Sequence, residues 1–202
     1  DAEELLKKGG APKKANSIKT DFIKKVQNFK PDLILLSVVE STWFLALDLL
    51  KSIPEKDRNY KTLFGGVFPT YAADKIIQNE VVDYVCRGEG EEPIIDLCNK
   101  LITNGRIDDI RNFTIKAEGN IYKNKLRAGM DLNTVPIPNW DLFDPGSLYR
   151  PMQGKIYRTV GVETQRGCPY TCTFCNSPGN NVIYKEETSR IFHRKKSIKS
   201  GD

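Results

Sequence analysis

The sequence lacks long hydrophobic runs and strong net charge, and each absence excludes a class of protein. Its longest apolar runs, LILLSVV and WFLALDLL, are too short or too interrupted to span a bilayer, and no charged-then-apolar leader precedes them. A net charge of +5 over 202 residues does not by itself indicate nucleic acid or an anionic membrane as a partner. We therefore expect a cytoplasmic globular protein of one or two domains, with no membrane partner.

Cysteine is scarce, and its distribution argues against a secreted disulfide framework. The five cysteines are odd in number, and Cys168, Cys172 and Cys175 lie within eight residues. This crowding predicts a reducing compartment and a metal or redox use for the three thiols. Cys86 and Cys98 fall in strand and helix patterns, where we expect buried structural residues.

Strand and helix patterns alternate over most of the first 130 residues. Strands are expected at 32–39, 61–68 and 82–88, and helices at 20–29, 41–53, 72–80 and 91–105, with Thr20 and either Ser41 or Thr42 as amino-terminal caps. A β-hairpin is expected at 112–129, turning at Gly119-Asn120. This order predicts an α/β fold with a Rossmann-like doubly wound parallel sheet. The sheet is expected to be incomplete, with one or two leading strands lying before residue 1.

A proline-rich stretch separates this region from the cysteines. Residues 131–151 hold four of the eleven prolines and show no clean periodicity, which indicates a domain boundary. The predicted division is a first domain over 1–130, a linker over 131–151 and a second domain over 152–202. Residues 156–167 are expected to form one strand that runs into the cysteine loop.

Three thiols without a fourth narrow the choice of metal. Soft sulfur ligands select zinc, copper(I) or iron–sulfur clusters. A structural zinc site needs a fourth protein ligand, and His193, the only histidine, is the one imidazole available. A cubane cluster held by three cysteines needs no fourth protein ligand, because its remaining iron can bind another molecule.

The cysteine loop also carries a family resemblance. RGCPYTCTFCNSP is similar to the cluster loop of radical S-adenosylmethionine enzymes, with Cys168, Cys172, Phe174 and Cys175 at the matching positions. The resemblance implies that the three cysteines hold a [4Fe-4S] cluster, that S-adenosylmethionine chelates the open iron, and that Phe174 lies near the adenine. It also implies the start of a (β/α) barrel, a flavodoxin or ferredoxin as electron donor, and a small-molecule or natural-product substrate.

A second resemblance covers residues 30–105. PDLILLSVVEST, LFGGVFPTYA and VDYVCRGEGEE look like the strand ends of the cobalamin-binding domain that precedes such radical domains, and PNWDLF resembles the linker between the two. The resemblance implies cobalamin at the carboxyl ends of the strands. The residues that would line its site are Ser37, Gly65, Gly66, Gly88, Glu89 and Gly90. The Asp-x-His-x-x-Gly motif that can supply a lower cobalt ligand is absent, which leaves that ligand open.

These features predict a fragment of a cobalamin-dependent radical S-adenosylmethionine enzyme that methylates or rearranges an unactivated carbon and is not catalytic alone. One alternative is a zinc-stapled α/β module that binds nucleic acid through a basic tail of Arg190, Arg194, Lys195, Lys196 and Lys199. A solvated helix face is the favoured reading of that tail, so nucleic acid is not expected as a partner. Another alternative keeps the radical enzyme but gives its first domain no cobalamin. The acidic run Glu89, Glu91 and Glu92 is assigned to the dipole of a helix start.

Overall fold

The computed structural model describes residues 17–143, 145–189 and 194–195. The chain divides into two compact units. Of the described residues, the larger unit, which we call the α/β unit, holds 17–129 and 167–189. The smaller one, the hairpin unit, holds 130–143, 145–166 and 194–195. The cysteine loop and the helix after it therefore belong to the same compact unit as the sheet.

The α/β unit is built on a five-stranded mixed sheet with the order β1-β2-β3-β4-β5. Its strands are β1 (Leu33–Ser37), β2 (Lys61–Gly65), β3 (Tyr84–Cys86), β4 (Phe113–Ala117) and β5 (Asn120–Lys123). The first three are parallel, and β4 and β5 add an antiparallel hairpin beside β3. Because β1 to β3 run in one direction, their carboxyl ends share one edge of the sheet, which we call the carboxyl edge.

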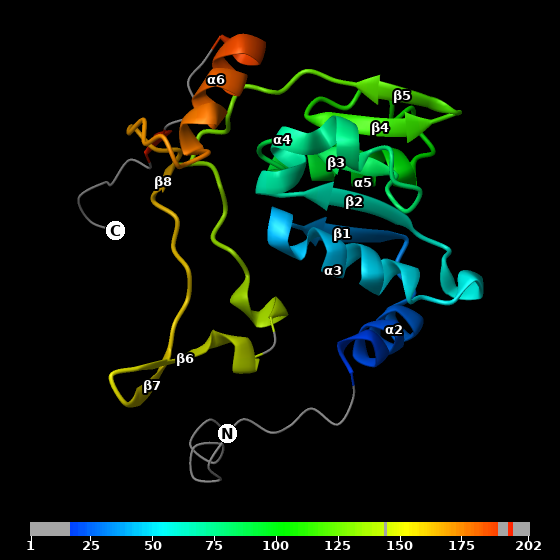
Figure 1. Ribbon diagram of the computed structural model, residues 1–202, viewed down its shortest axis with the longest axis horizontal. Coiled ribbons are helices and arrows are strands. Elements are labelled where there is room, and N and C mark those ends of the chain that lie inside the picture. Colours follow the sequence, from blue (N-terminus) through cyan, green and yellow to red (C-terminus); the bar gives the residue numbers. More distant parts are fainter. Residues whose placement is uncertain (1–16, 144, 190–193, 196–202) are drawn as a thin grey trace. The chain divides into compact units, whose positions relative to one another are not determined.

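Helices cover both faces of this sheet, as Figure 1 shows. They are α2 (Ile18–Phe29), α3 (Glu40–Lys51), α4 (Val67–Ile76) and α5 (Glu91–Ile102), with a short 3₁₀ turn η1 (Glu55–Asp57) after α3. Phe64 and Val85 face a core that includes residues of α2, α3 and α4. Their neighbours Leu63 and Tyr84 face a second core, to which α5 contributes Leu97. This alternation is the two-residue period of a strand buried on both faces.

The last helix of the unit, α6 (Ser177–Thr188), begins two residues after Cys175. In Figure 1 the arrowheads of β1 and β2 point toward the side on which α6 lies. Tyr184 of α6 is buried, with 1% of its surface exposed, so the helix is packed and not merely attached.

The hairpin unit has short elements and mostly exposed side chains. Its elements are the 3₁₀ turns η2 (Trp140–Leu142) and η3 (Pro145–Leu148) and the strands β6 (Tyr149–Met152), β7 (Lys155–Arg158), β8 (Gln165–Arg166) and β9 (Arg194–Lys195). The strands form two antiparallel pairs: β6 and β7 make a hairpin, and β8 pairs with β9, which follows α6 in the chain.

The structure confirms the predicted α/β class and order of elements, but several boundaries were wrong. The cap of α2 is Ser17, whose Oγ accepts from the Thr20 N–H at 3.2 Å, so Thr20 is the capped residue and not the cap. Ser41 and Thr42 lie inside α3, which begins at Glu40. The helix predicted from residue 72 starts at Val67, directly after the Gly-Gly pair.

The strand predicted over 156–167 is also corrected. Of this stretch, only residues 156–158, in β7, and Gln165–Arg166, in β8, are in strands, and β7 pairs back on β6, most of which lies within the predicted linker. The turn between them uses positive φ angles at Gln153 and Gly154. A glycine favours such a turn, because it adopts positive φ without steric cost. The hairpin at β4 and β5 is confirmed, with its turn at Glu118-Gly119 instead of Gly119-Asn120.

Within residues 17–143, 145–189 and 194–195, no helix has both the length and the hydropathy that crossing a bilayer requires. His193 and the basic residues Arg190, Lys196 and Lys199 lie outside the described residues.

Candidate functional site

The three clustered cysteines lie in a loop between β8 and α6. All three are free thiols; Cys168 is half-buried, and Cys172 and Cys175 are exposed. The Cys175 N–H donates to the Cys172 carbonyl at 3.3 Å, which closes a turn between the second and third thiol. The loop is tied to α6 by Asn181, whose Nδ2 donates to the Cys168 carbonyl at 3.4 Å.

The start of α6 acts on the third thiol. The Ser177 N–H donates to Cys175 Sγ at 3.4 Å. Hydrogen bonds from Ser177 stabilise the thiolate and lower the pKa of Cys175 below its ordinary value. A lowered pKa increases the fraction of thiolate, which is the form that ligates metals.

The donor chemistry of the loop fits a soft metal or an iron–sulfur cluster, because three free thiols lie on one short segment. No group of three or more cysteine, histidine, aspartate or glutamate side chains is arranged as a metal site within the part of the chain that the structure describes. The thiols are therefore near each other in sequence but not in ligand geometry. Phe174, predicted to lie near an adenine, is 91% exposed between them.

The residues predicted for cobalamin meet at the carboxyl edge of the sheet. Ser37 is the last residue of β1 and is exposed, and Gly65 is the last residue of β2. Ser37 and Gly65 are paired in register. Gly88, Glu89 and Gly90 follow the end of β3 and are half-buried. The structure thus brings Ser37 and Gly65 to the same edge of the sheet as Gly88, Glu89 and Gly90, as the sequence predicted.

The glycines at this edge differ in what their backbone requires. Gly66 has a φ of +99°, and a Cβ there would lie 2.8 Å from the Val38 carbonyl oxygen. Gly88 has a φ of +70°, and its Cβ would lie 2.4 Å from Tyr184 Oη. Both glycines are therefore needed by the fold itself. Gly65 differs, because a Cβ there would meet only the Cβ of Cys86 at 3.8 Å, an ordinary contact.

Two exposed apolar residues lie at the same strand ends as the Gly-Gly pair. Val39 follows β1 and is 46% exposed, and Val67 opens α4 and is 52% exposed. Together with the exposed residue Ser37, Val39 and Val67 make the carboxyl edge partly apolar and partly polar. This composition fits a large ligand with an apolar face and hydrogen-bonding groups at its periphery.

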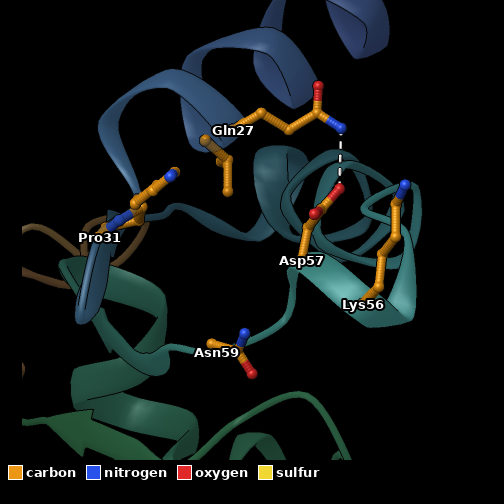
Figure 2. A pocket seen from close by; sticks show the side chains of 7 residues that line it. Gln27, Pro31, Lys56, Asp57 and Asn59 are labelled. Atoms are coloured by element: carbon orange, nitrogen blue, oxygen red, sulfur yellow. Dashed lines mark hydrogen bonds between the residues drawn. The ribbon is translucent and has the colours of Figure 1, made fainter.

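A hollow of about 270 Å³ lies elsewhere, where α2 ends and η1 follows α3. Figure 2 shows Gln27 reaching Asp57 across it, at 2.8 Å, with Pro31, Lys56 and Asn59 around it. The hollow is beside the amino-terminal ends of β1 and β2 and includes none of the predicted site residues.

The remaining cysteines and acidic residues have structural partners. Cys86 is buried at the end of β3, and burial is the main cause that raises the pKa of its thiol to about 12. Cys98 is half-buried on α5, so the predicted burial holds fully only for Cys86. Glu91 and Glu92 lie in the first turn of α5, as predicted, and Glu92 also accepts from Arg127 at 3.3 Å.

Sequence reasoning missed the residues that attach α6 to the carboxyl edge. They are Tyr71 on α4, Arg87 after β3, and Tyr184 and Glu187 on α6. The spacing of Tyr184 and Glu187, three positions apart on one helix face, was the only signal available in the sequence. That spacing names no partner, because the contacts are nearly 100 positions away along the chain.

Comparison with known proteins finds similarity to a B12-binding domain and to larger enzymes. Residues 11–97 match the family model of the B12 binding domain. An uncharacterized methyltransferase of Pyrococcus horikoshii is 26% identical over 89% of this chain and 40% of its own length. The anaerobic magnesium-protoporphyrin IX monomethyl ester cyclase of a Synechocystis strain is 28% identical over 79% of this chain and 32% of its own length.

A solved structure agrees with this assignment. The cobalamin-dependent S-adenosylmethionine radical enzyme OxsB, with aqua-cobalamin and S-adenosylmethionine bound, matches with a TM-score of 0.62 and 25% identity over 79% of this chain and 22% of its own. The α/β unit thus has an α/β fold that resembles the Rossmann-like B12-binding domain of OxsB. The chain is a homologue of the cobalamin-dependent radical S-adenosylmethionine enzymes. It spans less than half the length of each of these relatives.

Proposed function

We propose that this chain supplies the cobalamin-binding domain and the cluster loop of a cobalamin-dependent radical S-adenosylmethionine enzyme. One observation carries the proposal: a B12-binding fold and a loop of three free cysteines occur within a single compact unit. The reaction of the whole enzyme would be methylation or rearrangement of an unactivated carbon in a small-molecule substrate.

Each cofactor has its own residues in this proposal. Cys168, Cys172 and Cys175 hold a [4Fe-4S] cluster, and Phe174, almost fully exposed, is free to lie against the adenine of S-adenosylmethionine. When bound, the cluster would supply the electron that cleaves S-adenosylmethionine to a 5′-deoxyadenosyl radical. A cytoplasmic flavodoxin or ferredoxin would reduce it.

The carboxyl edge holds the cobalamin. Ser37 offers an exposed hydroxyl, Val39 and Val67 offer apolar contact, and Gly65 lets the ligand approach the backbone. Gly88, Glu89 and Gly90 border the same edge from the end of β3.

Cluster binding is tested by anaerobic reconstitution with iron and sulfide. Wild-type chain should retain iron and inorganic sulfide in equal amounts, with broad visible absorption, and Cys172→Ser should lose both. A Cys86→Ser, Cys98→Ser double variant is the control that should keep them. Metal retained without sulfide, or only while His193 is intact, would instead favour the zinc module.

Cobalamin binding is tested at Gly65, because the fold does not need a glycine there. Gly65→Ala should leave the thermal midpoint nearly unchanged and weaken hydroxocobalamin binding about tenfold, since its Cβ would stand where the ligand approaches. Val81→Ala, on the loop before β3, is a control that should bind normally. Unchanged affinity in Gly65→Ala would remove this edge as the cobalamin site.

A further inference from the structure

The helix that follows the cysteine loop is attached to the carboxyl edge of the sheet at three points. α6 and its partners all belong to the α/β unit, so the contacts lie inside one compact body. The partners come from α4, from the loop after β3 and from the segment after β5. Two of these three segments also carry residues proposed to bind cobalamin.

The first contact fixes the amino-terminal end of α6. Tyr71 Oη donates to the Asn176 carbonyl at 2.6 Å and lies 2.8 Å from Asn180 Oδ1. Tyr71 is on α4, five residues after Gly66. Tyr71 therefore connects the helix behind the Gly-Gly pair to the end of the cysteine loop.

The second contact fixes the middle of α6. Tyr184 is buried, and its Oη accepts from the Glu89 N–H at 3.0 Å. The same hydroxyl occupies the space beside Gly88. Gly88 in turn donates its N–H to Thr70 Oγ1 of α4 at 3.0 Å. The loop after β3, the start of α4 and the middle of α6 thus form one connected group.

The third contact uses both carboxylate oxygens of Glu187. Oε1 pairs with Arg87, directly after β3, and Oε2 accepts from the Leu126 N–H at 2.8 Å. Both members of the ion pair are about four-fifths buried, which strengthens the pair relative to a surface one. The carboxyl-terminal half of α6 is therefore held by charge as well as by packing.

We propose that α6 couples the two cofactor sites, so that filling of the carboxyl edge and filling of the cysteine loop favour each other. The proposal rests on the proposed function, because it requires both ligands. A ligand that orders the Gly65-Gly66 turn and the Gly88-Glu89 loop also orders Tyr71 and Tyr184, and through them the cysteine loop. Such coupling is reciprocal, so a cluster on the three cysteines raises the cobalamin affinity by the same factor. Tyr71, Tyr184 and Glu187 are positioning residues for this effect.

The test measures hydroxocobalamin affinity of the 202-residue chain by absorbance titration, with and without a reconstituted cluster. In wild type the cluster should lower the dissociation constant at least about fivefold. The double variant Tyr71→Phe, Glu187→Gln keeps the shape of both side chains. In it, the ratio of the dissociation constants without and with cluster should fall to less than about two. Circular dichroism checks that the variant is folded.

Matched controls come from the same unit. Tyr60→Phe changes a tyrosine just before β2, at the opposite end of the strand from Gly65. Asp109→Asn breaks the Lys100–Asp109 ion pair, which does not involve α6. Both controls should retain the wild-type ratio.

A second readout needs no cofactor. Backbone amides of residues 168–176 should exchange with deuterium about tenfold faster in the double variant than in wild type or the controls. Equal cobalamin affinity with and without cluster in wild type overturns the coupling alone. Absence of any cobalamin binding overturns the proposed function and the coupling together. Unchanged amide exchange in the double variant overturns the claim that Tyr71 and Glu187 hold the cysteine loop in place.

Discussion

At the scale of single residues, the glycines of the carboxyl edge serve two different purposes. Gly66 and Gly88 have positive φ angles and touch the chain's own atoms, whereas Gly65 has ordinary backbone and free space. The sequence presented all three as equivalent ligand-binding glycines. Only the contacts around each Cα separate a glycine that the fold needs from one that a ligand would need.

Gly88→Ala should therefore destabilise the protein by about 2 kcal/mol or more, because the left-handed backbone and the Tyr184 hydroxyl both oppose a Cβ. Gly119→Ala is the matched control: its φ is +76° but nothing lies within 4 Å, so about 1 kcal/mol is expected. Urea unfolding measures both. Tyr184→Phe should recover part of the Gly88→Ala loss, and equal losses in the two single variants would contradict the close approach.

The buried thiol of Cys86 predicts a pH dependence. Its pKa is about 12 in the folded chain against an ordinary value of 9.0. Between pH 8 and 10 the unfolded chain loses this proton while the folded chain keeps it, so stability falls as pH rises, by about 1 kcal/mol. The raised pKa of Tyr84, also about 12 against 10.0, adds to the fall mainly above pH 10.

The free energy of unfolding is measured with urea at pH 8, 9 and 10, and its slope with pH is compared between variants. Cys86→Ala should flatten the slope, whatever its effect on absolute stability, whereas Cys98→Ala should keep it. A slope that survives in Cys86→Ala would assign the effect to another group.

At the scale of elements, propensity located the helices but not their ends. The sequence at the start of α3 predicts a cap at Ser41 or Thr42. Instead Thr42 lies at the third helical position, and its Oγ1 accepts from the Val39 N–H at 3.1 Å. A Ser or Thr at the helix start can either cap the helix or accept a hydrogen bond from the backbone N–H of the cap residue, and the sequence alone does not distinguish the two.

Thr42→Ala should therefore cost about 1 kcal/mol, because the Val39 N–H loses its partner. Ser41→Ala, at the neighbouring exposed position, should change stability by less than about 0.5 kcal/mol. Thermal unfolding of the two variants compares the two hydroxyls; equal effects would show that the Thr42 contact contributes nothing.

At the scale of the whole molecule, the compact unit does not follow the order of the sequence. Proline content placed a boundary at 131–151, which remains a prediction. In the structure, the cysteine loop and α6, which follow Arg166, pack within the α/β unit, and Tyr184 is buried against the loop after β3. The cysteine loop is thus part of the same compact unit as the sheet that resembles a B12-binding domain.

A chain shortened to end at Arg166 should consequently be less stable than the full chain by about 2–4 kcal/mol, from the lost burial of Tyr184 and the lost Glu187 contacts. A chain that ends at Ser189 keeps α6 and is the control. Urea unfolding followed by circular dichroism compares the three. Equal stability of the two shortened chains would mean that α6 adds nothing to the unit.

The sequence by itself determined the α/β class, the parallel strands with their carboxyl edge, and the loop of three thiols, because each depends on local spacing or on periodicity. The tertiary structure decided which glycines are structural, which segments belong to the α/β unit, and which residues hold the cysteine loop. Those features depend on contacts between distant positions, such as Glu89 with Tyr184 across 95 residues. Local patterns carry no information about a partner so far along the chain, and only packing selects it.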